Sequence, residues 1–146
     1  MLSNTYSETA LENARNVAPL LSEAAAEIEA ERALTPAVLD AMHDAKLFRL
    51  TLPHRDNGLE LPLPALAQVA EIIAGADASA GWCLGQAFGC AMSAAFMDKV
   101  PAQQVFGARE AVLAWGAGVQ GRMEATDGGY LVSGTWRFAS GSHHAT

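Results

Sequence analysis

The chain has 146 residues, of which 51% are hydrophobic and 17% charged, so it can bury a core and is not a disordered polypeptide. Its 30 alanines, with aromatic side chains at only 7%, favour closely packed helices. Nine basic and 16 acidic residues give a net charge of −7, which argues against a nucleic-acid partner. No stretch is apolar enough for a membrane span, and no secretory signal is visible, so a cytoplasmic protein is expected.

The first predicted helix is amphipathic. Apolar residues from Leu11 to Ile28 recur at steps of three and four, with glutamates between them that should form a solvated face. Pro19 interrupts the pattern and removes one backbone hydrogen bond, so a kink or a helix start is expected near it.

Two further helices follow, separated by a loop. Thr35 and Pro36 are a start signal for the second helix, which should end near Phe48. Residues 51–63 are rich in turn-formers and predict a loop folded over the helical layer. The third helix should then run from residue 64 to about residue 76.

A fourth helix is predicted over residues 80–97, with Asp77 or Ser79 as its cap, and a short fifth over residues 101–108. The fourth carries no charge before its end, so it should be buried on all sides as the central helix, or face a partner outside this chain. Cys83 and Cys90 lie about 10.5 Å apart along its axis. They cannot form a disulfide while helical and are expected to be buried thiols with no metal or redox role.

From about residue 111 the pattern changes to β structure. An apolar run over residues 111–115 precedes two extended segments joined at Asp127, Gly128 and Gly129, which is typical of a β-hairpin. Three or four strands are predicted after residue 110. That number makes an incomplete sheet, whose edges and open face would need covering.

The predicted fold class is therefore a mainly α N-terminal helical domain, residues 1–110, followed by the start of a β domain, residues 111–146. The sequence is expected to be cut off inside the second domain.

This arrangement resembles the N-terminal portion of the acyl-CoA dehydrogenase superfamily. The stretches that carry the resemblance are residues 34–48, 52–53, 57–61, 70–82 and 129–145. The resemblance implies a truncated acyl-CoA dehydrogenase-like fold and a flavoprotein oxidoreductase that forms homo-oligomers.

Two features distinguish branches of the superfamily. The Thr-Glu-Pro and Gly-Ser-Asp stretch usual in the dehydrogenases is absent from residues 115–121, whereas residues 136–141 look like the two-component flavin-dependent monooxygenases. Similarity to that branch implies reduced FAD or FMN supplied by a separate flavin reductase, and hydroxylation of an aromatic or polycyclic small molecule. A flavin-dependent acyl-CoA dehydrogenase and a non-enzymatic helical interaction module are the alternatives.

The resemblance assigns three flavin contacts. Phe138 falls where the family places an aromatic ring against the flavin, Ser140 where a hydroxyl meets the flavin N5 edge, and Gly141 where the backbone comes close. Trp82 is a candidate for the substrate pocket. Read without the resemblance, residues 140–142 form a plain turn and the large aromatics fill a core: Trp82, Tyr130, Trp136 and Phe138.

No catalytic acid or base is assigned, and no metal ion is expected. Adjacent His143 and His144 would point in opposite directions on a strand and have no carboxylate nearby. His43 and His54 are isolated and expected on the surface or in loops. The related hydroxylases often have a histidine in the segment equivalent to residues 86–92, and this chain has none there.

Overall fold

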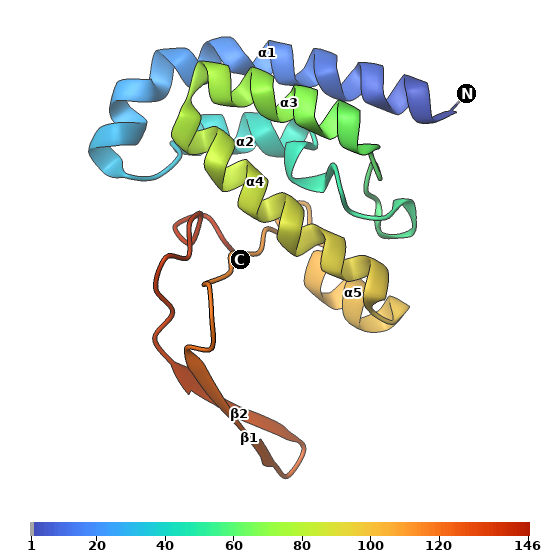
Figure 1. The fold of residues 1–146 in the computed structure, drawn as a ribbon, viewed down its shortest axis with the longest axis vertical. Helices are drawn as coiled ribbons and strands as arrows, with labels where there is room; N and C mark the ends of the chain where they lie inside the picture. The colour runs from blue at the N-terminus through green and yellow to red at the C-terminus, as the bar shows by residue number, and fades with distance from the viewer. Residues whose placement is uncertain (1) are drawn as a thin grey trace.

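The computed structural model describes residues 2–146 and confirms the predicted fold class, a mainly helical chain that leads into β structure (Figure 1). Three short 3₁₀ turns join its elements, at Leu47–Arg49, His54–Asp56 and Ser93–Phe96. The helices and strands are α1 (Leu2–Glu31), α2 (Pro36–Asp44), α3 (Leu63–Ala76), α4 (Ala78–Met92), α5 (Lys99–Phe106), β1 (Gly121–Thr126) and β2 (Gly129–Gly134).

Helix α1 buries one face and exposes its glutamates, as predicted. Ala14, Leu21 and Ile28 lie in the core at 0–4% exposure. The helix does not begin near Pro19, however, because it starts at Leu2 and continues through the proline. Pro19 lies on the exposed side of the helix. The backbone hydrogen bond that it removes costs less free energy than the burial of apolar side chains in the neighbouring turns provides, so the helix continues.

Helix α2 begins as predicted, since the Thr35 hydroxyl accepts a hydrogen bond from the Val38 amide at 3.3 Å. It ends at Asp44 and not near Phe48. The chain reverses at Lys46, which takes a left-handed φ of 56° and so breaks the helical repeat. Leu47 and Phe48, which follow Lys46, belong to a 3₁₀ turn and are buried there.

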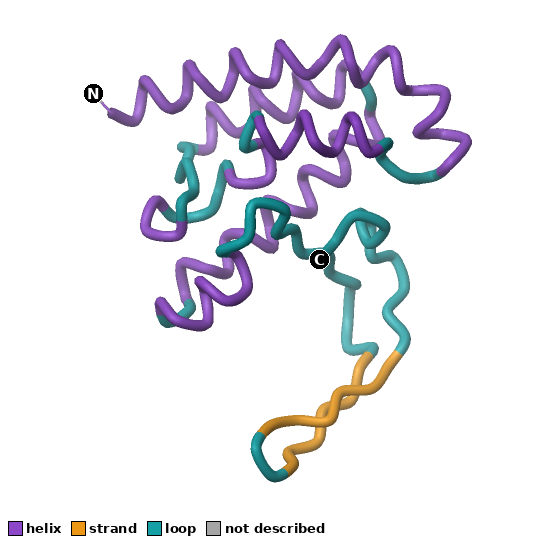
Figure 2. The backbone as a smooth tube through the Cα atoms, turned by 180° about the vertical axis from the view of Figure 1, so that it is seen from behind, coloured by secondary structure: helices purple, strands orange, loops and turns teal. Residues whose placement is uncertain are grey.

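The core lies between α1, α2, α3 and α4. Helix α1 runs alongside α3, α2 packs on α1, and α4 packs on α3 and on the Leu47–Arg49 turn (Figures 1 and 2). Each large side chain buried there contributes about 1.5–3 kcal/mol. The largest fully buried ones include Leu21, Met42, Leu47, Leu50, Val69, Ile73 and Leu84.

Helix α4 is capped by Asp77, whose carboxylate accepts from the Ala80 amide at 2.7 Å. The prediction that this helix is buried on all sides is wrong. Leu84 is fully buried on one face, but Trp82 on the other is 63% exposed, and the turn after the helix exposes 91% of Phe96. That α4 faces a partner outside the chain stays a prediction.

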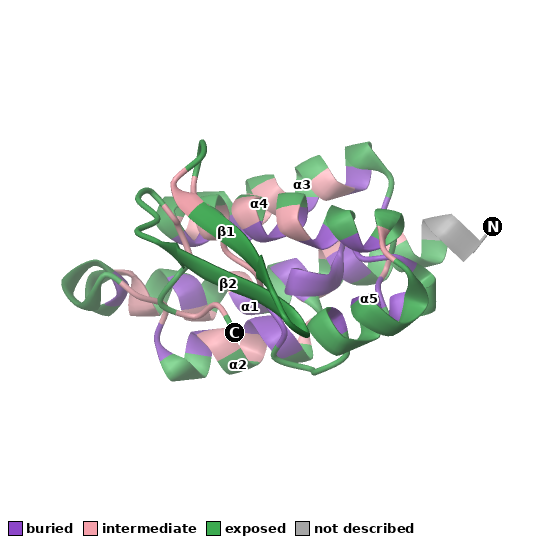
Figure 3. Ribbon diagram, turned by 90° about the horizontal axis from the view of Figure 1, so that it is seen from below, coloured by how far each residue is buried: buried purple, intermediate pink, exposed green. Residues whose placement is uncertain are grey.

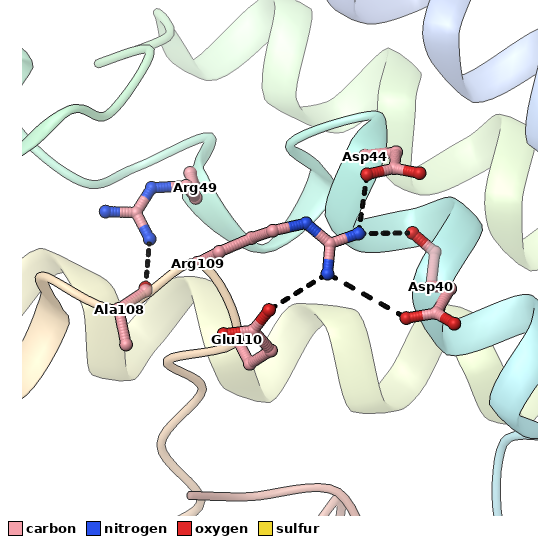
Figure 4. Close-up of polar contacts among 6 residues, drawn as sticks. All are labelled: Asp40, Asp44, Arg49, Ala108, Arg109 and Glu110. Atoms are coloured by element: carbon pink, nitrogen blue, oxygen red, sulfur yellow. Dashed lines mark hydrogen bonds and ion pairs between the residues drawn. The ribbon is translucent and has the colours of Figure 1, made fainter.

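A buried arginine fixes the loop of residues 51–62 to the end of α5. The Arg49 guanidinium donates to the backbone carbonyls of Asp56, Phe106, Asn57 and Ala108 at 2.8–3.1 Å. Figure 4 shows its bond to Ala108 beside the exposed cluster around Arg109. Five N–H donors in a planar fork suit this role.

The β segment differs from the prediction in extent. Within residues 2–146 there are two strands and not three or four, and residues 111–120 do not form a strand. No neighbouring strand pairs with that apolar run, and an extended segment without a ladder is not a strand. The hairpin itself is confirmed: Thr126 pairs with Gly129, and Gly128 closes the turn at a φ of 80° that glycine adopts readily.

The hairpin extends away from the helices (Figure 1), and both strands are exposed almost throughout (Figure 3). No helix in the described part of the chain is both long enough and apolar enough to cross a membrane.

Candidate functional site

The segment after β2 turns back from the hairpin and docks on the helices. The Trp82 indole on α4 donates to the Ser140 hydroxyl at 3.0 Å. The Thr146 amide donates to the Val112 carbonyl at 2.9 Å, and the Val112 amide donates to the Thr146 hydroxyl at 3.2 Å. The start of residues 139–146 is thus placed against the first turns of α4, and their end against residue 112, after α5.

Phe138 stands just before this docked segment in an unfavourable state. Its backbone φ is 57°, in the left-handed region, and its ring is 91% exposed. A bulky residue in that region costs roughly 1–2 kcal/mol of backbone strain. The exposed ring makes no packing contacts among the described residues that would offset this cost. Such an outlier is grounds for a functional hypothesis.

The predicted core placement of the large aromatics is wrong. Trp82, Tyr130, Trp136 and Phe138 are 47–91% exposed. Trp136 is the least exposed because its ring covers Gly121, where an added Cβ would lie 2.4 Å from the indole. These side chains are apolar by composition, but the described residues provide no surface that buries them.

Gly141 turns the docked segment with a φ of 85°, and an added Cβ there would lie 3.2 Å from His144 Nε2. The neighbour that a side chain at this position would meet is therefore His144, and the close approach of the Gly141 backbone to a flavin stays a prediction. Cys83 also lies beside it: burial and Asp77 raise the pKa of the Cys83 thiol, and a hydrogen bond from the Gly141 backbone opposes that shift. Both cysteines are free, as predicted, and half-buried rather than buried.

A histidine cluster lies beneath this turn. The Phe48 ring centroid lies 4.8 Å from that of His43 and 5.8 Å from that of His144. The surface or loop position predicted for His43 is wrong, because it is 6% exposed. Its place four residues after Leu39, on the apolar stripe of α2, was the signal that the sequence offered.

Burial lowers the pKa of both His43 and His144. Positive charge adds to the lowering of each pKa: that of Arg109 at His43, and at His144 that of His43 and His143 whenever they are protonated. His144 Nε2 is buried and has no hydrogen-bond partner among the described residues. Both rings are therefore favoured in the neutral form.

A cavity of about 750 Å³ opens between the end of α1, the junction of α3 and α4, and the docked segment. Its lining is mostly apolar at the α1 side and includes Cys83, Gly141, His143 and His144. Trp82 does not line it, so the structure brings Trp82 to Ser140 and not to this cavity. No group of three or more metal-ligating side chains gathers anywhere in residues 2–146.

The chain is similar to proteins of known activity, although no protein-family model matches it. It is 31% identical over 120 residues to an indole-3-acetate monooxygenase of Pseudomonas putida, covering 80% of this chain and 30% of the relative. It is 28% identical over 128 residues to a pigment production hydroxylase of Rhodococcus sp., covering 87% and 33%. The structure of XiaF from Streptomyces sp. in complex with FADH2 and glycerol superimposes with a TM-score of 0.90 at 26% identity, covering 98% of this chain and 36% of that one.

Over the part that it spans, the chain has the acyl-CoA dehydrogenase-like fold of its structural neighbours. The two relatives named above are a monooxygenase and a hydroxylase, so the similarity agrees with the resemblance to the flavin-dependent monooxygenases that the sequence suggested. It spans about a third of the length of the curated relatives that it matches.

Proposed function

We propose that this chain contributes the helical part and a flavin-contacting segment to a two-component flavin-dependent monooxygenase. In that reaction reduced flavin, FAD or FMN, arrives from a separate flavin reductase, and one oxygen atom of O₂ enters an aromatic or polycyclic small molecule. The observation that carries the proposal is the match of 98% of the chain to the structure of XiaF, which holds FADH2, beside the similarity to an indole-3-acetate monooxygenase. Absence of the dehydrogenase stretch from residues 115–121 supports the same branch.

Phe138 and the first residues of the docked segment fit one side of a flavin. Phe138 offers an exposed aromatic face, which suits packing against an isoalloxazine ring. Ser140 offers a hydroxyl that both donates and accepts at the N5 edge. Gly141 keeps the backbone free of a Cβ next to them. When bound, the flavin supplies the oxygen chemistry, and these residues orient it and exclude water.

The same proposal covers the organisation of the protein. Residues 1–110 form the helical domain and residues 111–146 the start of a β domain. Trp82, at the head of α4 and next to Ser140, borders the substrate. The protein acts in the cytoplasm as a homo-oligomer, and its partners are the small-molecule substrate and the reductase.

The test supplies the protein that contains this chain with reduced FAD or FMN and with ¹⁸O₂. Indole-3-acetate is one trial substrate, because a relative is named for it, and simple phenols are others. Mass spectrometry should find one ¹⁸O atom in the product. Reduction of oxidised flavin by an acyl-CoA, with no oxygen incorporated from any aromatic compound, would instead support the dehydrogenase alternative.

A further inference from the structure

The hydrogen bond between Trp82 and Ser140 fixes the direction in which the serine donates. An indole N–H is a donor only, so the Ser140 oxygen must be the acceptor in the 3.0 Å contact. One lone pair of the hydroxyl is then occupied on the α4 side. Its single proton and its other lone pair are left for a group on another side.

The docked segment is held firmly enough for this direction to matter. Contacts on the C-terminal side of Ser140 fix the backbone: Gly141 lies against Cys83 and His144, and Thr146 pairs with Val112. Ser140 is itself partly buried. With the backbone fixed, only rotation of the serine side chain is free, and the Trp82 indole restricts that rotation.

Trp82 is not explained as a packing residue. It is 63% exposed on the open face of α4, so its ring gains little from burial where it stands. The polar tip is the part that makes a defined contact, 58 residues along the chain.

We propose that Trp82 is a positioning residue for the flavin, which acts through Ser140 by holding the serine hydroxyl so that its proton is donated away from α4 and toward the flavin edge. This inference rests on the proposed function. Trp82 itself need not touch the flavin. Its indole N–H donates to one lone pair of the Ser140 oxygen, and cooperative polarisation then makes the serine O–H a better donor.

The test is a double-mutant cycle on flavin binding, measured by equilibrium titration with oxidised FAD and FMN and, anaerobically, with their reduced forms. Trp82→Phe keeps an aromatic ring and removes only the N–H. It should weaken binding of the preferred flavin about three- to tenfold, the range of one neutral hydrogen bond. In a Ser140→Ala background the same change should have no further effect, whereas in a Ser140→Thr background, which keeps the hydroxyl, it should weaken binding as in the wild type.

Trp115→Phe is the matched control, because Trp115 is 52% exposed and its indole makes no hydrogen bond among the described residues; its binding should equal the wild type. The Trp82 indole N–H resonance, followed by NMR without flavin, should shift and exchange faster with water in Ser140→Ala. That readout reports the hydrogen bond independently of any activity.

Two results would overturn the inference while leaving the proposed function intact. The first is wild-type flavin affinity in Trp82→Phe. The second is an undiminished effect of Trp82→Phe in the Ser140→Ala background, which would mean that Trp82 contacts the flavin directly. If the wild-type protein binds neither flavin in either redox state, the proposed function fails, and the inference fails with it.

Discussion

Arg49→Met is expected to lower the free energy of unfolding by about 3–5 kcal/mol. The Arg49 guanidinium donates to four backbone carbonyls, and the bonds to Asp56 and Phe106 are buried, at 3.0 and 2.8 Å. A buried carbonyl left without a donor costs about 1–3 kcal/mol, so these two together account for about 2–6 kcal/mol. The bonds to Asn57 and Ala108 are only partly buried, so water can replace the donor there.

The measurement is urea unfolding of the protein, followed by far-ultraviolet circular dichroism. Arg109→Met is the control, because Arg109 also contacts several oxygens, including Asp44 at 2.5 Å and Glu110 at 3.0 Å, but at the surface (Figure 4). Exposed ion pairs contribute little, so its effect should be far smaller. Equal losses in the two variants would refute the reasoning.

Arg49→Lys separates charge from geometry and guards against an Arg49→Met variant that does not fold. An ammonium carries three donors on one atom and cannot reach four carbonyls that surround a planar fork. Its loss of stability should fall between those of the wild type and Arg49→Met. A wild-type unfolding midpoint for Arg49→Lys would show that the fork geometry is unimportant.

Three further predictions concern the docked segment and residues next to it. Phe138→Asn should raise stability by about 0.5–1 kcal/mol in urea unfolding, because asparagine tolerates the left-handed backbone, and should weaken flavin binding in the same titration as above; a loss of stability would contradict the argument from strain. Stability should be greatest above pH 6.5, the ordinary histidine pKa, and fall as the pH drops below it, because burial lowers the folded-state pKa of His43 and His144 and the unfolded chain then binds protons first. The slope is at most about 1.4 kcal/mol per pH unit for each histidine, and unfolding midpoints that do not change across this range would exclude the effect. Gly141→Ala should cost about 1–2 kcal/mol and more than Gly128→Ala, since both glycines have a φ of 80–85° but only at Gly141 does the new Cβ approach a side chain; equal costs in thermal unfolding would mean that His144 simply moves aside.

Local signals in the sequence predicted most of the helical part. Thr35 and Asp77 cap the helices for which they were candidates, and each accepts a hydrogen bond from an amide three residues on. Caps are reliable because the groups that they satisfy lie within one turn of the same chain. The end of α2 was missed because the left-handed backbone of Lys46 depends on the packing that follows it, and lysine carries no preference for that conformation.

The burial of single residues was harder to predict than the elements. The isolation of His43 from other polar motif residues predicts a surface or loop position, although its place on the α2 stripe points inward. Arg49 was not singled out at all, because the carbonyls that it binds come from residues 56–57 and 106–108. A requirement for a donor at a distant loop leaves no periodic pattern in the sequence.

The errors over aromatic residues have a common cause that bears on function. Periodicity identifies a side chain as apolar, but the surface that covers it can belong to a bound molecule or to another segment. Trp82, Trp136 and Phe138 are exposed, and all three lie next to or within the stretch that carries Ser140 and Gly141. Local stability does not favour the strained backbone at Phe138. Nor does it favour the exposed position of the Trp82 indole, whose N–H donates to Ser140. Conflicts of this kind concentrate at functional sites, and the flavin contact proposed above would account for the exposure of Phe138.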